Sequence, residues 1–281
     1  MNRRFAAVLV PLLGLSLVAC TKSSSNEASA DPKAALVAST SGIKTGNYSF
    51  AATMPSGATT KAVVHTPSKS AALDIETIEE GAKGRMQVRV TDPARFVKLT
   101  ADMSAAEQQV ESLAAASKDP QTAKMVQATR VLIELFSGKN WLKTDLNRVT
   151  SEVLKVSAED PDMAGVNTLF TGIATAKQDG SVISGTLDAT VVKDDVHLID
   201  SSMVKGVDPA VAKAIPYTAT LDGEGRLSKL VLDLPKSTDS PAGKFTVEFT
   251  GYGAATKQEA PPAAEVKDMP AEAYEVLNSK D

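Results

Sequence analysis

Few side chains in this 281-residue sequence could carry out acid–base or nucleophilic chemistry. The chain contains two histidines, His65 and His197, and one cysteine, Cys20. These counts exclude zinc sites with several thiolates, histidine-rich metal sites and an internal disulfide framework. Both histidines fall in or near predicted strands, and neither has a Ser or Cys at a spacing that indicates a catalytic triad. We interpret them as ordinary surface or core residues.

Three short motifs are similar to catalytic or metal-binding elements, but each is incomplete. Gly180–Gly185 lacks the glycine spacing of a nucleophile elbow. Lys44–Gly46 has the Lys-Thr-Gly of penicillin-binding proteins, but the Ser-x-x-Lys of Ser202–Lys205 follows it instead of preceding it. Asp160–Asp162 could begin a calcium loop, but Thr171 stands where a bidentate Glu is required. The sequence therefore predicts a protein that is not an enzyme, with no cofactor and no metal site.

The single cysteine stands where a covalent modification is expected. Arg3 and Arg4 precede the apolar run Phe5–Val18, which is too short and too interrupted to span a bilayer as a mature helix. The run ends in Leu17–Cys20, which looks like a bacterial lipobox, in which the thiol of Cys20 receives a diacylglyceryl group and a peptidase cuts before it. Residues 1–19 are therefore predicted to be a lipoprotein signal peptide. The alternatives are an ordinary secretory signal with a chance cysteine, or a buried core cysteine.

Lipidation would anchor the protein at the extracytoplasmic face of the cell membrane. Residues 20–33 are predicted to be the lipidated cysteine and a flexible tether with a reach of about 20 Å. Cleavage removes two arginines and lowers the net charge from −4 to −6, so attachment would depend on acyl chains such as palmitate and not on a basic patch. The acidic balance also argues against a nucleic-acid partner.

Alternation of apolar and polar residues predicts strands near both ends of the sequence. The first group comprises Thr45–Met54, Lys61–Thr66, Ala71–Ile78, Arg85–Thr91 and Arg95–Thr100. The second group comprises Ser181–Val192, Pro216–Asp222, Arg226–Leu234 and Lys244–Gly253. One face of each strand is apolar and the other polar, which is typical of an antiparallel sheet with one face in water.

The middle of the chain has helical periodicity instead. Ser104–Glu107 is a capping box that opens one helix. Asp119 and Pro120 start a second helix, which ends before Gly138. Further elements are predicted from similar signals: a short strand around Trp141, a short helix from Thr150, a longer helix from Asp160 through Ile173, and a short helix from Asp208.

No break in composition divides residues 34–259, which we interpret as a single α+β domain. Its sheet comes from both ends of the sequence, and the central helices cover one face. The prolines of Ala260–Glu265 predict an extended C-terminal tail over residues 260–281.

Four stretches together resemble the LppX/LprG-type lipoproteins of the actinobacterial envelope. They are Leu17–Cys20, Tyr48–Phe50, Pro216–Leu227 and Phe249–Pro262. The resemblance covers the mature chain as an arrangement, and it implies a LolA-like half-barrel of curved antiparallel sheet with helices on its concave face. It also implies an apolar cavity for a multi-acylated lipid or glycolipid. The two helices within Ser104–Gly138 depart from the family, where a shorter crossover is expected, and they could cover the cavity mouth or fill the cavity.

The expected function is to bind a lipid or acylated glycolipid for carriage or transfer in the cell envelope. Removing a sixteen-carbon chain from a bilayer requires replacement burial of about 13 kcal/mol, at about 0.8 kcal/mol per CH₂, which an apolar cavity can provide. The residues expected to line the cavity are Phe50, Leu73, Ile75, Val88, Val126, Ile133, Phe136, Leu169, Phe170, Ile173, Leu187, Leu230, Leu232 and Phe249.

The same side chains could instead fill one another's space at normal packing density. The protein would then be a non-catalytic signalling or scaffold lipoprotein of the same fold with a filled core. It would act through protein partners, such as a membrane transporter or another envelope protein. A hydrolase with an unrecognised site is the third class of function that the sequence leaves open.

Overall fold

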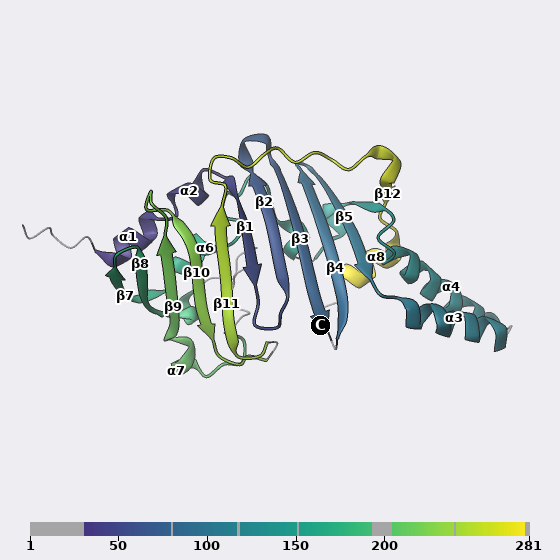
Figure 1. The fold of residues 1–281 in the computed structure, drawn as a ribbon. Coiled ribbons are helices and arrows are strands. Elements are labelled where there is room, and N and C mark those ends of the chain that lie inside the picture. Colours follow the sequence, from purple (N-terminus) through teal and green to yellow (C-terminus); the bar gives the residue numbers. More distant parts are fainter. Residues whose placement is uncertain are drawn as a thin grey trace, which may run out of the picture. The chain divides into compact units, whose positions relative to one another are not determined.

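Twelve strands of the computed structural model join in one sheet, and helices accompany it (Figure 1). The structure describes residues 31–79, 81–116, 119–150, 152–192, 204–238 and 240–278. The predicted signal peptide, Cys20 and the tether up to residue 30 lie outside the described residues, as does His197. The α+β class and the mostly antiparallel sheet that the sequence predicts are confirmed.

The first half of the sheet is a meander in which each strand pairs antiparallel with the next. Its strands are β1 (Asn47–Thr53), β2 (Thr59–His65), β3 (Ser70–Glu79), β4 (Ala82–Thr91) and β5 (Ala94–Ala101). The register places Phe50, Ala62, Leu73 and Val88 in one row, so the alternation gives a continuous apolar face. β6 (Trp141–Thr144) continues beside β5, and β12 (Val266–Asp268) pairs with β6 in parallel.

Five strands of the C-terminal half form the other side of the sheet. They are β7 (Ile173–Asp179), β8 (Val182–Leu187), β9 (Ile215–Leu221), β10 (Leu227–Leu234) and β11 (Gly243–Thr250). The two sides meet where β1 pairs with β11 and Phe50 lies opposite Phe249. The strand order in the described chain is β12-β6-β5-β4-β3-β2-β1-β11-β10-β9-β8-β7, with β12 and β7 at the two open edges.

Short helices contribute to the apolar layer on one face of the sheet. They are α1 (Pro32–Ala38), α2 (Ser41–Lys44), α5 (Glu152–Lys155), α6 (Val166–Phe170) and α8 (Ala271–Asn278). Each provides a side chain to the core cluster of the sheet, namely Leu36, Ile43, Leu154, Leu169 and Tyr274. In Figure 1 α6 lies behind the sheet. The connections also hold the short helices η1 (Thr66–Ser68), η2 (Leu146–Arg148), η3 (Ala189–Val191), α7 (Pro209–Ala212) and η5 (Ala263–Glu265).

Two longer helices, α3 (Ser104–Ala116) and α4 (Pro120–Leu135), form a pair beside β5 and β6. Asp119 caps α4 as predicted, because its carboxylate accepts hydrogen bonds from the N–H groups of Gln121 (3.0 Å) and Thr122 (2.9 Å). In Figure 1 the pair extends beyond β5 and does not lie over the sheet. Only the end of α4 contributes to the core cluster of the sheet, through the buried Leu135 and the half-buried Leu132.

The prediction of a long helix from Asp160 through Ile173 is wrong. Only α6 is helical, and β7 begins at Ile173. Asp162 starts α6 by accepting hydrogen bonds from the N–H groups of Val166 (3.0 Å) and Asn167 (2.7 Å). A Cβ at Gly172 would lie 2.5 Å from the carbonyl oxygen of Asp188. The chain approaches the end of β8 closely here, and the helix ends.

The C-terminal residues also differ from the predicted extended tail. Residues 251–265 cross from β11 to β12 along the upper ends of the strands in Figure 1, and β12 and α8 follow. Met269, Ala273 and Tyr274 belong to the core cluster, and the Tyr274 hydroxyl accepts a hydrogen bond of 2.8 Å from the Asp145 N–H. At the other end, α1 begins at Pro32, two residues before the predicted domain boundary.

Candidate functional site

Most residues predicted to line a cavity lie in one layer between the sheet and the short helices. Nine of the fourteen are buried in the core cluster: Phe50, Leu73, Val88, Leu169, Phe170, Leu187, Leu230, Leu232 and Phe249. Phe136 and Ile173 are half-buried against the same cluster. The structure therefore brings eleven of the predicted residues together.

Three of the predicted residues lie apart from this layer. Val126 is buried in α4, and Val110 is buried in α3, but neither belongs to the core cluster. We assign both valines to the contact between the two helices. Ile75 and Ile133 are half-buried and also lie outside the cluster.

Near α6 the apolar layer contains a pocket of only about 10 Å³. All of its lining residues are aliphatic: Leu169, Leu187, Ala189, Val192, Val204, Ile215, Leu232 and Leu234. A space of this size is at the lower limit of what a single water molecule needs, about 10–15 Å³. In this conformation the side chains here fill one another's space, and an acyl chain does not fit between them.

A larger pocket of about 400 Å³ lies where α4 meets β6 and the residues around β12, and we call it the α4 pocket. Val131, Leu135, Leu142 and Pro270 form its apolar lining. Leu135 and Leu142 also belong to the core cluster, so the pocket borders the apolar layer. Its polar lining residues are Gln127, Arg130, Glu134, Asn140, Lys267 and Asp268.

Charges of both signs surround the α4 pocket. The Glu134 carboxylate lies 3.8 Å from the ammonium groups of both Lys139 and Lys267, and Arg130 lies 3.3 Å from Glu111. All of these side chains are at least half exposed. Such pairs contribute only about 0–1 kcal/mol each, so they can rearrange around a polar ligand group at low cost.

A series of hydrogen-bonded side chains begins at His65 and was not predicted from the sequence. Its Nδ1 lies 2.6 Å from Ser68 Oγ, which lies 2.8 Å from Ser70 Oγ, and Ser70 accepts a hydrogen bond of 2.9 Å from the Gln258 N–H. The His-x-x-Ser spacing was the signal that could have revealed the first contact. Ser70 belongs to β3 and is fully buried, so these hydrogen bonds attach the segment after β11 to β3.

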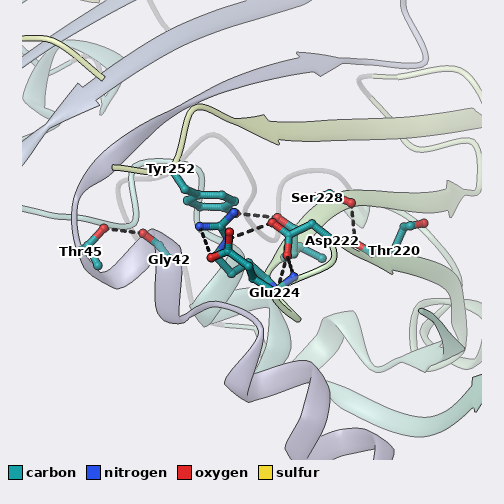
Figure 2. Close-up of polar contacts among 9 residues, drawn as sticks. Gly42, Thr45, Thr220, Asp222, Glu224, Ser228 and Tyr252 are labelled. Carbon is teal, nitrogen blue, oxygen red and sulfur yellow. Dashed lines mark hydrogen bonds and ion pairs between the residues drawn. The ribbon is translucent and has the colours of Figure 1, made fainter. Parts of the chain in front are cut away.

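The hairpin and C-terminal stretches that carry the family resemblance form a structural corner (Figure 2). Arg226 Nε lies 2.9 Å from Asp222 Oδ2, and Arg226 Cζ lies 4.8 Å from the ring centre of Tyr252. The Tyr252 hydroxyl donates a hydrogen bond of 2.6 Å to the Leu227 carbonyl. A Cβ at Gly42 would lie 2.7 Å from the Tyr252 ring, so glycine lets α2 approach this corner.

Asp222→Asn should lower the free energy of unfolding by about 1 kcal/mol at pH 7, and the difference should shrink in acid. Burial alone would raise the pKa of Asp222, but hydrogen bonds from Arg226 and Glu224 lower this pKa overall. A carboxyl group of this kind stabilises the fold above its unfolded-state pKa, and this contribution is lost as the pH falls through the folded-state pKa.

Urea unfolding at pH 7 and at about pH 3 measures this change, and Asp179→Asn at the exposed end of β7 is the matched control. An equal loss for Asp222→Asn at both pH values would show that the charge of Asp222 does not matter.

No protein-family model and no curated protein matches this chain. Among the described residues, no three His, Cys, Asp or Glu side chains gather as a metal site would require. None of the described helices is long and apolar enough to cross a membrane.

Proposed function

We propose that the protein is a membrane-anchored lipoprotein of the LppX/LprG type that binds a lipid or an acylated glycolipid and carries or transfers it in the cell envelope. An acylated Cys20 would hold it at the extracytoplasmic face of the cell membrane. The observation that carries the proposal is the α4 pocket, which borders the apolar layer at Leu135 and Leu142. The proposal includes the LolA-like half-barrel, with the short helices on the concave face of the sheet.

The α4 pocket suits an amphiphile in size and in chemistry. Its volume of about 400 Å³ is within the range of small-molecule sites, about 300–1,000 Å³. An acyl chain would contact the apolar lining, at a gain of about 0.8 kcal/mol for each buried CH₂. The polar head would meet charges of both signs at Arg130, Glu134 and Lys267. Carriage of this kind breaks no covalent bond and needs no catalytic group.

Val131→Trp tests the proposal, because Val131 lines the α4 pocket from a half-buried position. The indole ring would occupy the space of the ligand. We expect the variant to lose co-purified or titrated lipid by about ten-fold or more, which corresponds to about 1.4 kcal/mol of binding free energy. Overpacking a filled core costs about 1–3 kcal/mol, so a melting temperature close to that of the parent would show that the ring fills open space.

Met125→Trp is the matched control, because Met125 is on the same helix, is 51 % exposed and does not line the pocket. Native mass spectrometry of the parent and both variants, made without residues 1–20, measures the bound lipid. Equal lipid binding by the parent and Val131→Trp would rule out the α4 pocket as the site.

The scaffold function is the second candidate, and the pocket of about 10 Å³ near α6 favours it. A protein with a core filled in this way would bind its protein partners through its surface and would hold no acyl chain. A parent protein that carries no lipid in native mass spectrometry, and that binds no acyl-chain probe in titration, would support the scaffold and contradict lipid carriage.

A further inference from the structure

The face of the sheet opposite the short helices has a polar groove of about 450 Å³. It crosses the strands from β11 through β1, β2 and β3 to β4. Figure 1 shows this face toward the viewer, without a described helix over it. The groove therefore lies on the other side of the sheet from the apolar layer, and it does not depend on the proposed lipid site.

Small side chains form the floor of the groove. Ser49, Val63 and Ala72 lie side by side in the register of β1, β2 and β3. Thr250 of β11 continues this row on one side and Arg89 of β4 on the other. Longer residues stand in the neighbouring row, where Lys61 pairs with Asp74 and Asp74 with Gln87. Ala51, which pairs with Lys61, adds another short side chain to the lining.

The segment after β11 closes one side of the groove. Gln258 lines it, and the Gln258 side-chain oxygen accepts a hydrogen bond of 2.7 Å from Arg89 Nη1. The Ala255 N–H donates to the Asn47 side chain at 2.8 Å, which fixes the same segment over β1. At the far end Trp141 lies beneath two cations, with Lys98 Nζ 5.2 Å and Arg89 Cζ 6.0 Å from its ring centre.

Two carboxylates and two cations line the groove. Asp74 is held by Arg85 through two hydrogen bonds of 2.7 and 2.5 Å, and Glu248 by Lys229 at 2.8 Å. Arg85 and Lys229 do not line the groove. Among the residues that the structure describes, Lys61 and Arg89 have no carboxylate in an ion pair with them. Because each carboxylate of the lining has its ion-pair partner outside the groove, Lys61 and Arg89 remain to meet an anionic group of a ligand.

Lys61 and Arg89 are close enough to act on one ligand. They belong to β2 and β4, which flank β3, so their strands are about 10 Å apart. Both side chains also lower the pKa of Asp74, although the hydrogen bond from Arg85 is the largest cause of that shift. Hydroxyl and amide groups of Ser49, Thr250 and Gln87 complete the polar lining.

We propose that this groove binds a small hydroxylated molecule with one anionic group, such as a sugar phosphate or a sugar acid, between Lys61 and Arg89. The two cations hold the anion by charge-assisted hydrogen bonds. The neutral polar side chains hydrogen-bond the hydroxyl groups. The groove volume of about 450 Å³ is within the range of small-ligand sites, about 300–1,000 Å³.

Calorimetric titration of the full folded chain with glucose 6-phosphate, glucuronate and neutral glucose tests the proposal. At least one of the two anions should bind saturably, and glucose should not. Lys61→Gln should weaken the binding about ten-fold, as expected for the loss of one charge-assisted hydrogen bond. Ala51→Trp should abolish binding without any change of charge, because Ala51 is an exposed residue that lines the groove.

Lys177→Gln is the matched control, since Lys177 is an exposed lysine of β7 outside the groove. The proposal is overturned if neither anion binds, if Lys61→Gln binds as well as the parent, or if Lys177→Gln weakens binding equally. Binding to anionic phosphatidylglycerol vesicles alone, with the same dependence on Lys61, would make the groove a membrane contact and would also overturn it. Unchanged melting temperatures of Lys61→Gln and Ala51→Trp would show that the comparison is made between folded proteins.

Discussion

Cys20→Ala is expected to abolish both fatty-acid labelling and cleavage before residue 20. The chain has a single thiol, so no other residue can form the thioether to diacylglycerol. Two or three acyl chains anchor a protein stably, and the variant would lack them while it keeps the apolar run Phe5–Val18. Expression in a bacterial host with a fatty-acid probe, followed by mass measurement of the purified protein, gives the result.

Ser23→Ala is the matched control for Cys20→Ala, because it changes the tether and leaves the predicted lipobox intact. The control should be labelled and cut like the parent. A Cys20→Ala protein that is still labelled and still cut after Ala19 would refute the lipobox.

Phe249→Ala should destabilise the fold by about 3–5 kcal/mol, because a buried aromatic side chain is replaced by a cavity. Phe249 is 3 % exposed, and its ring centre lies 5.9 Å from that of Tyr48 and 6.1 Å from that of Phe50. It is opposite Phe50 where the two halves of the sheet join. We expect the melting temperature to fall by roughly 10 °C.

Thr250→Ala is the control for Phe249→Ala, because Thr250 is the next residue of β11 and points to the open face. Its effect should be within about 0.5 kcal/mol. Urea unfolding of both variants measures the difference. A loss below about 1 kcal/mol for Phe249→Ala would show that the core rearranges to fill the space.

The strands with one face in water were predictable from local sequence. Alternation placed Phe50, Leu73 and Val88 on the buried face, and the turn at Asp222 fixed one hairpin. Local capping likewise predicted α4, because the carboxylate of Asp119 satisfies backbone N–H groups at its start.

The failed predictions concern segments whose structure depends on distant contacts. Met163, Val166, Leu169 and Phe170 are all buried against the sheet, and their spacing imitates a long helical stripe. The close approach of Gly172 to Asp188, which ends α6, cannot be read from residues near Gly172. α8 was missed for a related reason, since its Tyr274 is buried only by its partners elsewhere in the chain.

The candidate site was less predictable than the fold. Apolar residues that line a pocket and those that fill a core have the same sequence pattern. Only the three-dimensional structure shows that Leu142 lines the α4 pocket, whereas Leu187 lies in the filled layer near α6. Polar lining residues such as Glu134 and Lys267 are 133 positions apart in the sequence. No local motif marks such a pair.

The pairing of β1 with β11 has a consequence for the order in which the chain folds. β2 begins only a few residues after β1 ends. The other neighbour of β1 is β11, which begins at Gly243, almost two hundred positions later. Contacts of such long sequence separation form slowly, because closing the intervening chain costs entropy before any contact is gained. A chain emerging from a ribosome or a translocation channel must therefore keep one side of β1 unpaired until nearly all of it has been delivered. During that interval the N–H and C=O groups of that side are open to a strand of another molecule. The joint at the middle of the finished sheet is thus the place where intermolecular association competes with folding.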